Sequence, residues 1–117
     1  MTRLFVYGTL KRGCRSHRLL ANQKFLGEAR TAAGFQMFHL GRFPGVVRAP
    51  DRPSSIGGEV FLVDDSCLRA LDDFEGVSEG LYNRELVQLE HPHPAAYMYL
   101  FLGGIEGKAL LDGDWAE

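Results

Sequence analysis

Short apolar runs recur along the chain, some alternating with polar residues, and glycine- or proline-containing turns separate them. Such runs predict β-strands, because successive side chains of a strand point to opposite faces of a sheet. Strands are expected at residues 4–7, 25–30, 35–40, 46–48, 56–63, 81–90 and 95–102. The pattern therefore predicts a fold dominated by six or seven strands.

One stretch changes clearly to helical spacing. Leu68, Leu71 and Phe74 recur every three residues, which places them on one face of a helix. Asp64-Asp65-Ser66 supplies N-cap residues immediately before them, so a helix is expected over residues 66–73. A shorter helix is expected through residues 19–21, where Ser16 precedes an apolar pair and acts as its cap.

The turns between strands indicate how these elements are arranged. Residues 41–45 and 91–94 are short enough for antiparallel hairpins. Gly57-Gly58 marks a bulge or a close backbone approach within its strand. The tail after residue 103 is rich in glycine and acid, and Trp115 is expected to cover an open end of the core. The predicted fold class is α+β, a small, mixed, mainly antiparallel β-barrel with flanking short helices, forming one domain over residues 1–117.

Composition narrows the function classes. The 117 residues carry a net charge of -2, so neither nucleic acid nor an anionic membrane is expected as a partner. No secretory leader or membrane-spanning run is evident, and a cytoplasmic protein with Cys14 and Cys67 as reduced thiols is expected. His91 and His93 lack the partner ligands of a metal site, so no metal is expected. A monomer or weak homodimer is anticipated.

The first candidate for chemistry is the turn that follows residues 4–7. A buried strand leading directly into Gly8 exposes main-chain donors to a small anionic ligand, and Thr9, Lys11 and Arg12 add polar groups. Gly8 and Gly13 share the glycine spacing of a P-loop, but Cys14-Arg15 stands where that motif needs Lys and Ser or Thr, so a nucleotide site is rejected. The alternative is a plain turn with solvated basic residues.

The second candidate is the acidic end of the expected helix. Glu75 follows Asp72 and Asp73 and lies between apolar segments. A partly desolvated carboxyl group at this position would have a raised pKa, as a general acid/base requires. A solvated acidic helix end is the alternative, and composition alone favours it. Tyr97 and Tyr99 share one face of the last strand, where their rings either reach a pocket or fill the core.

Five short motifs together resemble one known family. They are Tyr7-Gly8-Thr9-Leu10 with Lys11-Arg12-Gly13 after it, Phe43-Pro44-Gly45, Gly58-Glu59-Val60-Phe61, Leu71-Asp72-Asp73-Phe74-Glu75-Gly76 and Tyr82-Asn83-Arg84. In this order they are similar to the motifs of the gamma-glutamylcyclotransferase-like family, with the gamma-glutamylamine cyclotransferases as the most similar branch. The resemblance extends over residues 4–102 and implies that family's small mixed α/β barrel.

The resemblance also implies a reaction and its residues. The substrate's α-amine attacks its own γ-carbonyl and releases 5-oxoproline and a free amine, without a cofactor. Tyr7, Gly8, Thr9 and Leu10 correspond to the turn that binds the γ-glutamyl part, and Glu75 corresponds to the catalytic glutamate, a general acid/base. Tyr99 is the better match to a further substrate-binding tyrosine, with Tyr97 as the other candidate. The expected partner is a small-molecule γ-glutamyl substrate.

Two segments depart from the family pattern and leave the substrate open. Cys14-Arg15-Ser16-His17 replaces a more polar run, and residues 48–55 form a loop particular to this chain. Both are expected to flank the pocket, so the leaving amine is not determined. The alternative function is a non-catalytic module that binds a γ-glutamyl or related carboxylate metabolite.

Overall fold

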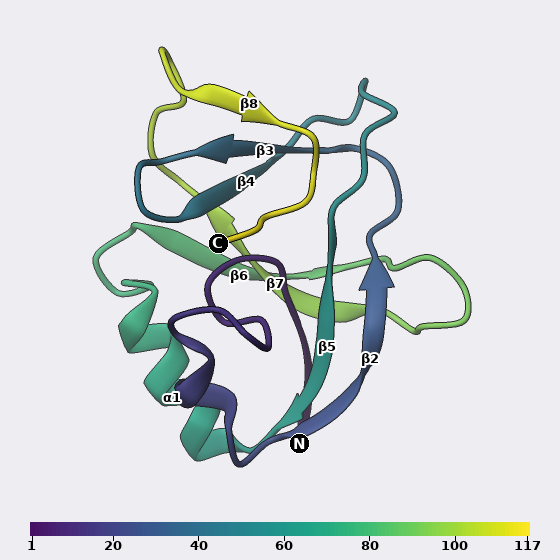
Figure 1. Ribbon diagram of the computed structural model, residues 1–117, viewed down its shortest axis with the longest axis vertical. Coiled ribbons are helices and arrows are strands. Elements are labelled where there is room, and N and C mark those ends of the chain that lie inside the picture. Colours follow the sequence, from purple (N-terminus) through teal and green to yellow (C-terminus); the bar gives the residue numbers. More distant parts are fainter.

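The computed structural model describes residues 1–117 and contains two β-sheets with helices beside the larger one (Figure 1). The elements in chain order are β1 (Thr2–Val6), η1 (His17–Leu20), β2 (Lys24–Arg30), β3 (Phe35–His39), β4 (Pro44–Arg48), β5 (Gly57–Val63), α1 (Asp65–Phe74), β6 (Tyr82–Val87), β7 (Ala96–Phe101) and β8 (Ala109–Leu111). The larger sheet has the order β2-β5-β1-β7-β6, and the smaller has the order β4-β3-β8.

The predicted α+β class is confirmed, and so is the mainly antiparallel pairing. Only β1 and β7 run parallel, and every other neighbouring pair is antiparallel. The smaller sheet lies across one end of the larger one (Figure 1), and β4 packs beside β7. The two hydrogen-bonded sheets remain separate, so the arrangement is barrel-like but is not closed into a barrel.

Two details of the strand prediction are wrong. The tail contains β8, which pairs with β3 through Met37 and Leu111. Three residues are too few to show an alternating pattern, so this strand depends on its tertiary partner. The strand predicted to reach residue 90 ends at Val87, and beyond it only an isolated bridge joins Leu89 to Thr31.

The two glycines at the start of β5 mark a close approach and not a bulge. A Cβ on Gly58 would clash with the carbonyl oxygen of Val6 and would lie 2.7 Å from Cζ of Phe5. The register shift of this sheet instead lies in β2, between Phe25 and Gly27. Gly58 thus allows β5 to lie tightly against β1 just before the Gly8 turn.

Strand β1 is buried on both faces, which explains its continuous apolar sequence. Leu4 and Val6 belong to a core cluster shared with α1 and η1. Phe5 and Tyr7 belong to a second cluster, which faces the smaller sheet and includes Trp115. The expected role of Trp115 in covering the core is confirmed, and β1 forms the wall between two cores.

Helix α1 is positioned by its cap and by one apolar face. The Asp64 side chain accepts a hydrogen bond of 2.7 Å from the Cys67 backbone N–H, and Leu71 is buried against the sheet. Phe74, predicted to share this face, is 46% exposed at the end of the helix. Ser16 forms no side-chain cap of η1, so its predicted capping role is wrong. None of the helices has the length and apolar character needed to cross a bilayer.

Candidate active site

A cavity of about 410 Å³ lies at the end of β1 that leads into the Gly8 turn. Three segments far apart in the sequence border it: residues 5–10, residues 42–44 and residues 74–75. Tyr82 and Tyr99 also border it, together with Arg15, Ser16 and Leu81. The fold therefore brings the two stretches singled out in the sequence, the Tyr7–Leu10 turn and Glu75, to one cavity.

Gly8 has a structural reason in addition to the predicted approach of a ligand. A Cβ at this position would lie 2.9 Å from Cγ and 3.0 Å from Cδ of Pro44. Such distances are too short for carbon atoms, so only glycine lets the turn pack against the start of β4. The missing Cβ thus makes room for Pro44, which also borders the cavity.

The turn presents unpaired main-chain donors at the cavity. The Gly8 and Thr9 carbonyl oxygens accept hydrogen bonds from the backbone N–H groups of Lys11 (3.2 Å) and Ser16 (2.9 Å), which fix the shape of the turn. The backbone N–H groups of Gly8, Thr9 and Leu10 form no hydrogen bond within the protein. Successive unpaired N–H groups of this kind suit a carboxylate or an oxyanion.

The two basic residues of the turn act as anchors, and the Arg12 side chain also remains 48% exposed to solvent. Lys11 Nζ donates a hydrogen bond of 2.5 Å to the backbone oxygen of Trp115. Arg12 donates to the carboxylate of Glu59 from its backbone N–H (2.8 Å) and from Nε (3.2 Å). The Arg12 guanidinium also lies 3.6 Å from the ring centroid of Phe25. These contacts hold the turn rigidly against β2, β5 and the C-terminal segment.

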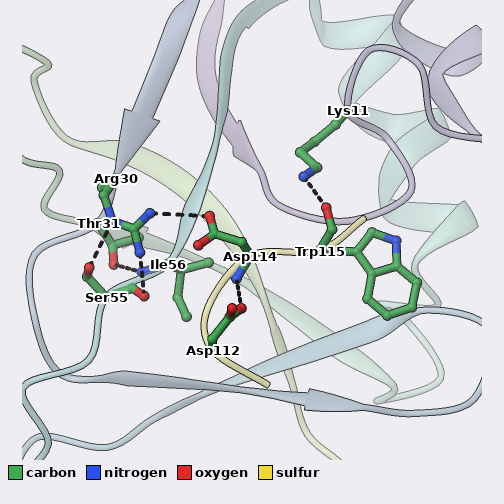
Figure 2. A network of polar contacts seen from close by, with 8 residues as sticks. All are labelled: Lys11, Arg30, Thr31, Ser55, Ile56, Asp112, Asp114 and Trp115. Carbon is green, nitrogen blue, oxygen red and sulfur yellow. Dashed lines mark hydrogen bonds and ion pairs between the residues drawn. The ribbon is translucent and has the colours of Figure 1, made fainter. Parts of the chain in front are cut away.

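The C-terminal segment is itself bound to the end of β2, on the side away from Lys11. Figure 2 shows Asp114 and Trp115 between Arg30 on one side and Lys11 on the other. Arg30 Nη1 pairs with the Asp114 carboxylate at 3.2 Å, while its other nitrogens donate to Ser55. The network joins the Gly8 turn to the C-terminal segment and, through Asp114 and Arg30, to the end of β2, so the turn is held by more than one element.

Glu75 stands at the C-terminal end of α1 with its side chain partly buried in the cavity wall. Its backbone N–H donates to the Leu71 carbonyl oxygen at 2.8 Å. No protein group forms a hydrogen bond or an ion pair with its carboxylate. Burial raises the pKa of Glu75 to about 7, because the ionised form loses water without gaining a partner. The carboxyl group can therefore exchange a proton near neutral pH.

Three tyrosines lie close enough to Glu75 to be affected by its charge. Burial is the main cause of the raised pKa of Tyr7, Tyr82 and Tyr99, and the Glu75 carboxylate contributes to each. Tyr7 donates its hydroxyl hydrogen to the Tyr99 backbone oxygen (2.7 Å), and Tyr82 donates to that of Pro44 (2.9 Å). These hydroxyls stay neutral and hold the walls together, which leaves Glu75 as the proton-exchanging group of the cavity.

Of the two tyrosines of β7, Tyr97 and Tyr99, only Tyr99 lies in the cavity wall. Tyr99 borders the cavity and donates to Oδ1 of Asp72 at 2.7 Å. Tyr97 shares its face, as predicted, but lies outside the cavity wall, with the Arg84 guanidinium 5.4 Å from its ring centroid. The geometry thus favours Tyr99 as the residue available to a ligand.

Sequence reasoning missed several residues of the cavity wall as site residues. Tyr82 and Phe43 are parts of the quoted family motifs, so the motif order was the signal that could have identified them. Arg42 carries no such signal. Ser16 belongs to residues 14–17, which were expected to flank the pocket, and Arg15 and Ser16 do border it. Residues 48–55, the other segment expected there, lie outside the cavity wall. Ser16 is 7% exposed and its hydroxyl has no protein partner, and Arg42 follows a glycine in an ordinary turn.

Asp72 connects the wall to the end of α1. Its carboxylate pairs with Arg84 through two hydrogen bonds of 2.9 Å and accepts a third from Tyr99. The Arg84 hydrogen bond is the main cause that lowers the pKa of Asp72. Asp72 thus ties the last turn of α1 to β6 and β7, three residues before Glu75.

We expect Asp72→Asn to lower the free energy of unfolding by about 1–2 kcal/mol at pH 7, because it leaves the partly buried Arg84 without its charge partner. The native aspartate binds its proton more weakly than the unfolded one. Its contribution is therefore complete above pH 3.8, the ordinary pKa, and is lost as the pH falls further. Urea unfolding at pH 7 and pH 3 measures this, with the exposed neighbour Asp73→Asn as control. An equal loss at both pH values would contradict an electrostatic role.

Comparison with known proteins agrees with this fold and cavity. The fold is a small α+β arrangement in which the Gly8 turn and Glu75 border one cavity. Residues 4–117 match the model of the family described as gamma-glutamyl cyclotransferase, AIG2-like. The chain belongs to this family, and its membership supports cyclotransferase activity.

Named relatives share most of the chain. It is 31% identical over 116 residues to the gamma-glutamylcyclotransferase family protein YtfP of Escherichia coli K12, covering 98% of this chain and 96% of the relative. It is 35% identical over 96 residues to the gamma-glutamylaminecyclotransferase of Rattus norvegicus, covering 76% and 64%. The crystal structure of a mouse AIG2-like protein superposes with a TM-score of 0.83 at 26% identity, covering 97% and 87%.

Proposed function

We propose that this protein is a gamma-glutamyl cyclotransferase that releases 5-oxoproline and a free amine from γ-glutamyl amides. One observation carries the proposal: Glu75, whose pKa is raised to about 7 by burial, shares a cavity with the unpaired N–H groups of Gly8, Thr9 and Leu10. A proton-exchanging group facing anion-binding donors is what an intramolecular acyl transfer requires. The similarity to the rat gamma-glutamylaminecyclotransferase supports amide substrates of this kind.

The cavity walls offer complementary partners to the γ-glutamyl part. The N–H groups of the turn are donors for its anionic oxygens. The hydroxyls of Tyr82 and Tyr99 already donate to Pro44 and Asp72, so toward a ligand they act as acceptors, which suits its α-ammonium group. When the cavity walls hold both ends of the γ-glutamyl part in a folded-back conformation, the α-nitrogen lies close to the γ-carbon. Most of the rate advantage of an intramolecular reaction comes from such positioning.

The chemical step needs only one proton carrier. The α-nitrogen forms a bond to the γ-carbon, and the bond from that carbon to the leaving nitrogen breaks. The Glu75 carboxylate takes the proton that the attacking nitrogen loses, and then gives it to the leaving nitrogen. Atoms and electrons balance without a further reactant. The N–H groups of Gly8 to Leu10 stabilise negative charge that develops on the γ-carbonyl oxygen.

The test is 5-oxoproline release from a panel of γ-glutamyl amides between pH 5 and 9. Because Glu75 must begin as a carboxylate, kcat/KM is expected to rise with pH below its pKa. The slope of log(kcat/KM) against pH should fall by one near pH 7. The slope that remains above pH 7 belongs to the substrate's own amine, with an ordinary pKa of about 8.

Two results would overturn the proposal in different ways. A profile without a change of slope between pH 6 and 8 contradicts Glu75 as the proton acceptor. No release from any amide, together with thermal stabilisation by the same compounds, identifies a binding module without catalysis.

A further inference from the structure

Arg42 is a cation without an anionic partner at the mouth of the cavity. It borders the cavity and is exposed, and its guanidinium forms no hydrogen bond or ion pair with the protein. The other arginine of the wall, Arg15, is neutralised: its backbone N–H and its Nη1 donate to the Glu117 carboxylate at 2.9 and 3.2 Å. The positive charge available to a ligand therefore belongs to Arg42.

The backbone that carries Arg42 is held in place. It lies in the β3–β4 turn, where the Leu40 N–H donates to the Phe43 carbonyl oxygen at 2.9 Å. The Gly41 N–H donates to Nδ1 of His39 at 3.0 Å, and the His39 ring packs on Trp115 with centroids 5.4 Å apart. The turn is thus tied to the C-terminal segment of Figure 2, so only the Arg42 side chain has to be ordered by a ligand.

Apolar side chains surround the same mouth. Phe43, Phe74 and Leu81 border the cavity and are 37%, 46% and 43% exposed. Large apolar side chains left partly exposed around one opening gain stability when a ligand covers them. Phe74 directly precedes Glu75 in the chain, so the apolar rim lies next to the proton-exchanging carboxyl group.

We propose that this mouth selects the leaving group: Arg42 binds a carboxylate on it, and the apolar rim covers an apolar side chain. This inference rests on the proposed function and names its substrate class, γ-glutamyl derivatives of apolar α-amino acids. Glu75 must reach both nitrogens, so the substituent of the leaving nitrogen extends outward from Glu75 past Phe74. The main-chain donors of Gly8 to Leu10 serve the γ-glutamyl half further inside. A cationic leaving group is disfavoured beside Arg42.

The test uses a matched pair of substrates, γ-glutamylphenylalanine and γ-glutamylphenylalaninamide, which differ only in the carboxylate. We expect Arg42→Gln to lower kcat/KM for the first about tenfold, the effect of losing one charge-assisted contact. The kcat/KM for the second substrate should change less than twofold. For each substrate, kcat/KM of the wild type is divided by kcat/KM of the variant, which removes the difference in intrinsic reactivity between the two substrates. γ-Glutamylglycine, which lacks the apolar side chain, should be a poorer substrate than γ-glutamylphenylalanine.

The matched control is Arg69→Gln, an exposed arginine on α1 that lies outside the cavity wall and has no partner. It should leave both substrates unchanged. An equal loss for both substrates in Arg42→Gln, or no loss, would overturn the inference. If neither substrate releases 5-oxoproline, calorimetric binding of the same pair still decides the inference, while release from the wider panel of γ-glutamyl amides decides the proposed function. The inference is supported if Arg42→Gln binds γ-glutamylphenylalanine tenfold more weakly than wild type but binds the amide equally well. It is refuted if the substitution changes the affinity for both ligands equally.

Discussion

Glu75→Gln is expected to lower kcat for 5-oxoproline release by about 10²–10⁴-fold, the usual contribution of a general acid/base. Glutamine has nearly the same shape but cannot take a proton from the attacking nitrogen or return one to the leaving nitrogen. The carboxylate has no protein partner, so its removal breaks no internal contact. KM should therefore change little.

The same substitution is expected to stabilise the fold above neutral pH. Between pH 4.5 and about 7 the unfolded chain has released the Glu75 proton while the native chain retains it. Wild type therefore loses stability as the pH rises through this window. One pKa unit corresponds to about 1.4 kcal/mol, so the difference in unfolding free energy between Glu75→Gln and wild type should increase by about 2–3 kcal/mol from pH 4.5 to pH 8.

Activity and stability together separate catalysis from structure. Glu79→Gln, which changes an exposed glutamate outside the cavity wall, should leave both the rate and the pH dependence of urea unfolding unchanged. A merely structural role for Glu75 predicts that activity and stability fall together. Loss of activity with gained stability at pH 8 is the combination that only a buried, unpaired, proton-carrying glutamate produces.

The sequence could predict the two halves of the site but not their full surroundings. The turn after β1 and the carboxyl group after α1 each have a local signal, a glycine after an apolar strand and an acid between apolar segments. The ordered motifs connected them. Arg42 carries no such signal, because its place at the mouth arises only when the β3–β4 turn and the end of α1 border the same cavity. A pattern of single residues contains no information about contacts of this kind.

The same limit explains the errors about individual glycines and strands. The spacing of Gly57-Gly58 indicates an unusual backbone but does not tell a bulge from a close approach, since both need a residue without Cβ. Likewise, β8 is a strand because β3 offers it a free edge. The apolar run of β1 and the N-cap of α1 are local and were predicted, whereas pairings between distant segments were not.

Gly58→Ala is expected to lower the free energy of unfolding by about 3 kcal/mol, at the upper end of the cost of overpacking a core. The added Cβ would clash with the Val6 carbonyl oxygen and lie 2.7 Å from Cζ of Phe5. A flexible side chain could move away, but the Val6 oxygen belongs to the backbone of β1, which pairs with β5 through Val6 and Glu59. Relief of the clash therefore requires the two central strands to separate.

This strain should also reach the active site, because Val6 leads directly into Tyr7 and the Gly8 turn. Gly58→Ala is thus expected to lower the melting temperature by about 10 °C and to reduce kcat/KM in the fraction that remains folded. Gly104→Ala is the matched control, since a Cβ there meets no atom within 4 Å. Thermal unfolding followed by circular dichroism measures the first effect, and 5-oxoproline release measures the second. A loss below 1 kcal/mol in Gly58→Ala would show that β1 and β5 can separate without cost, and the rigid placement of the turn against Glu75 would then need another cause.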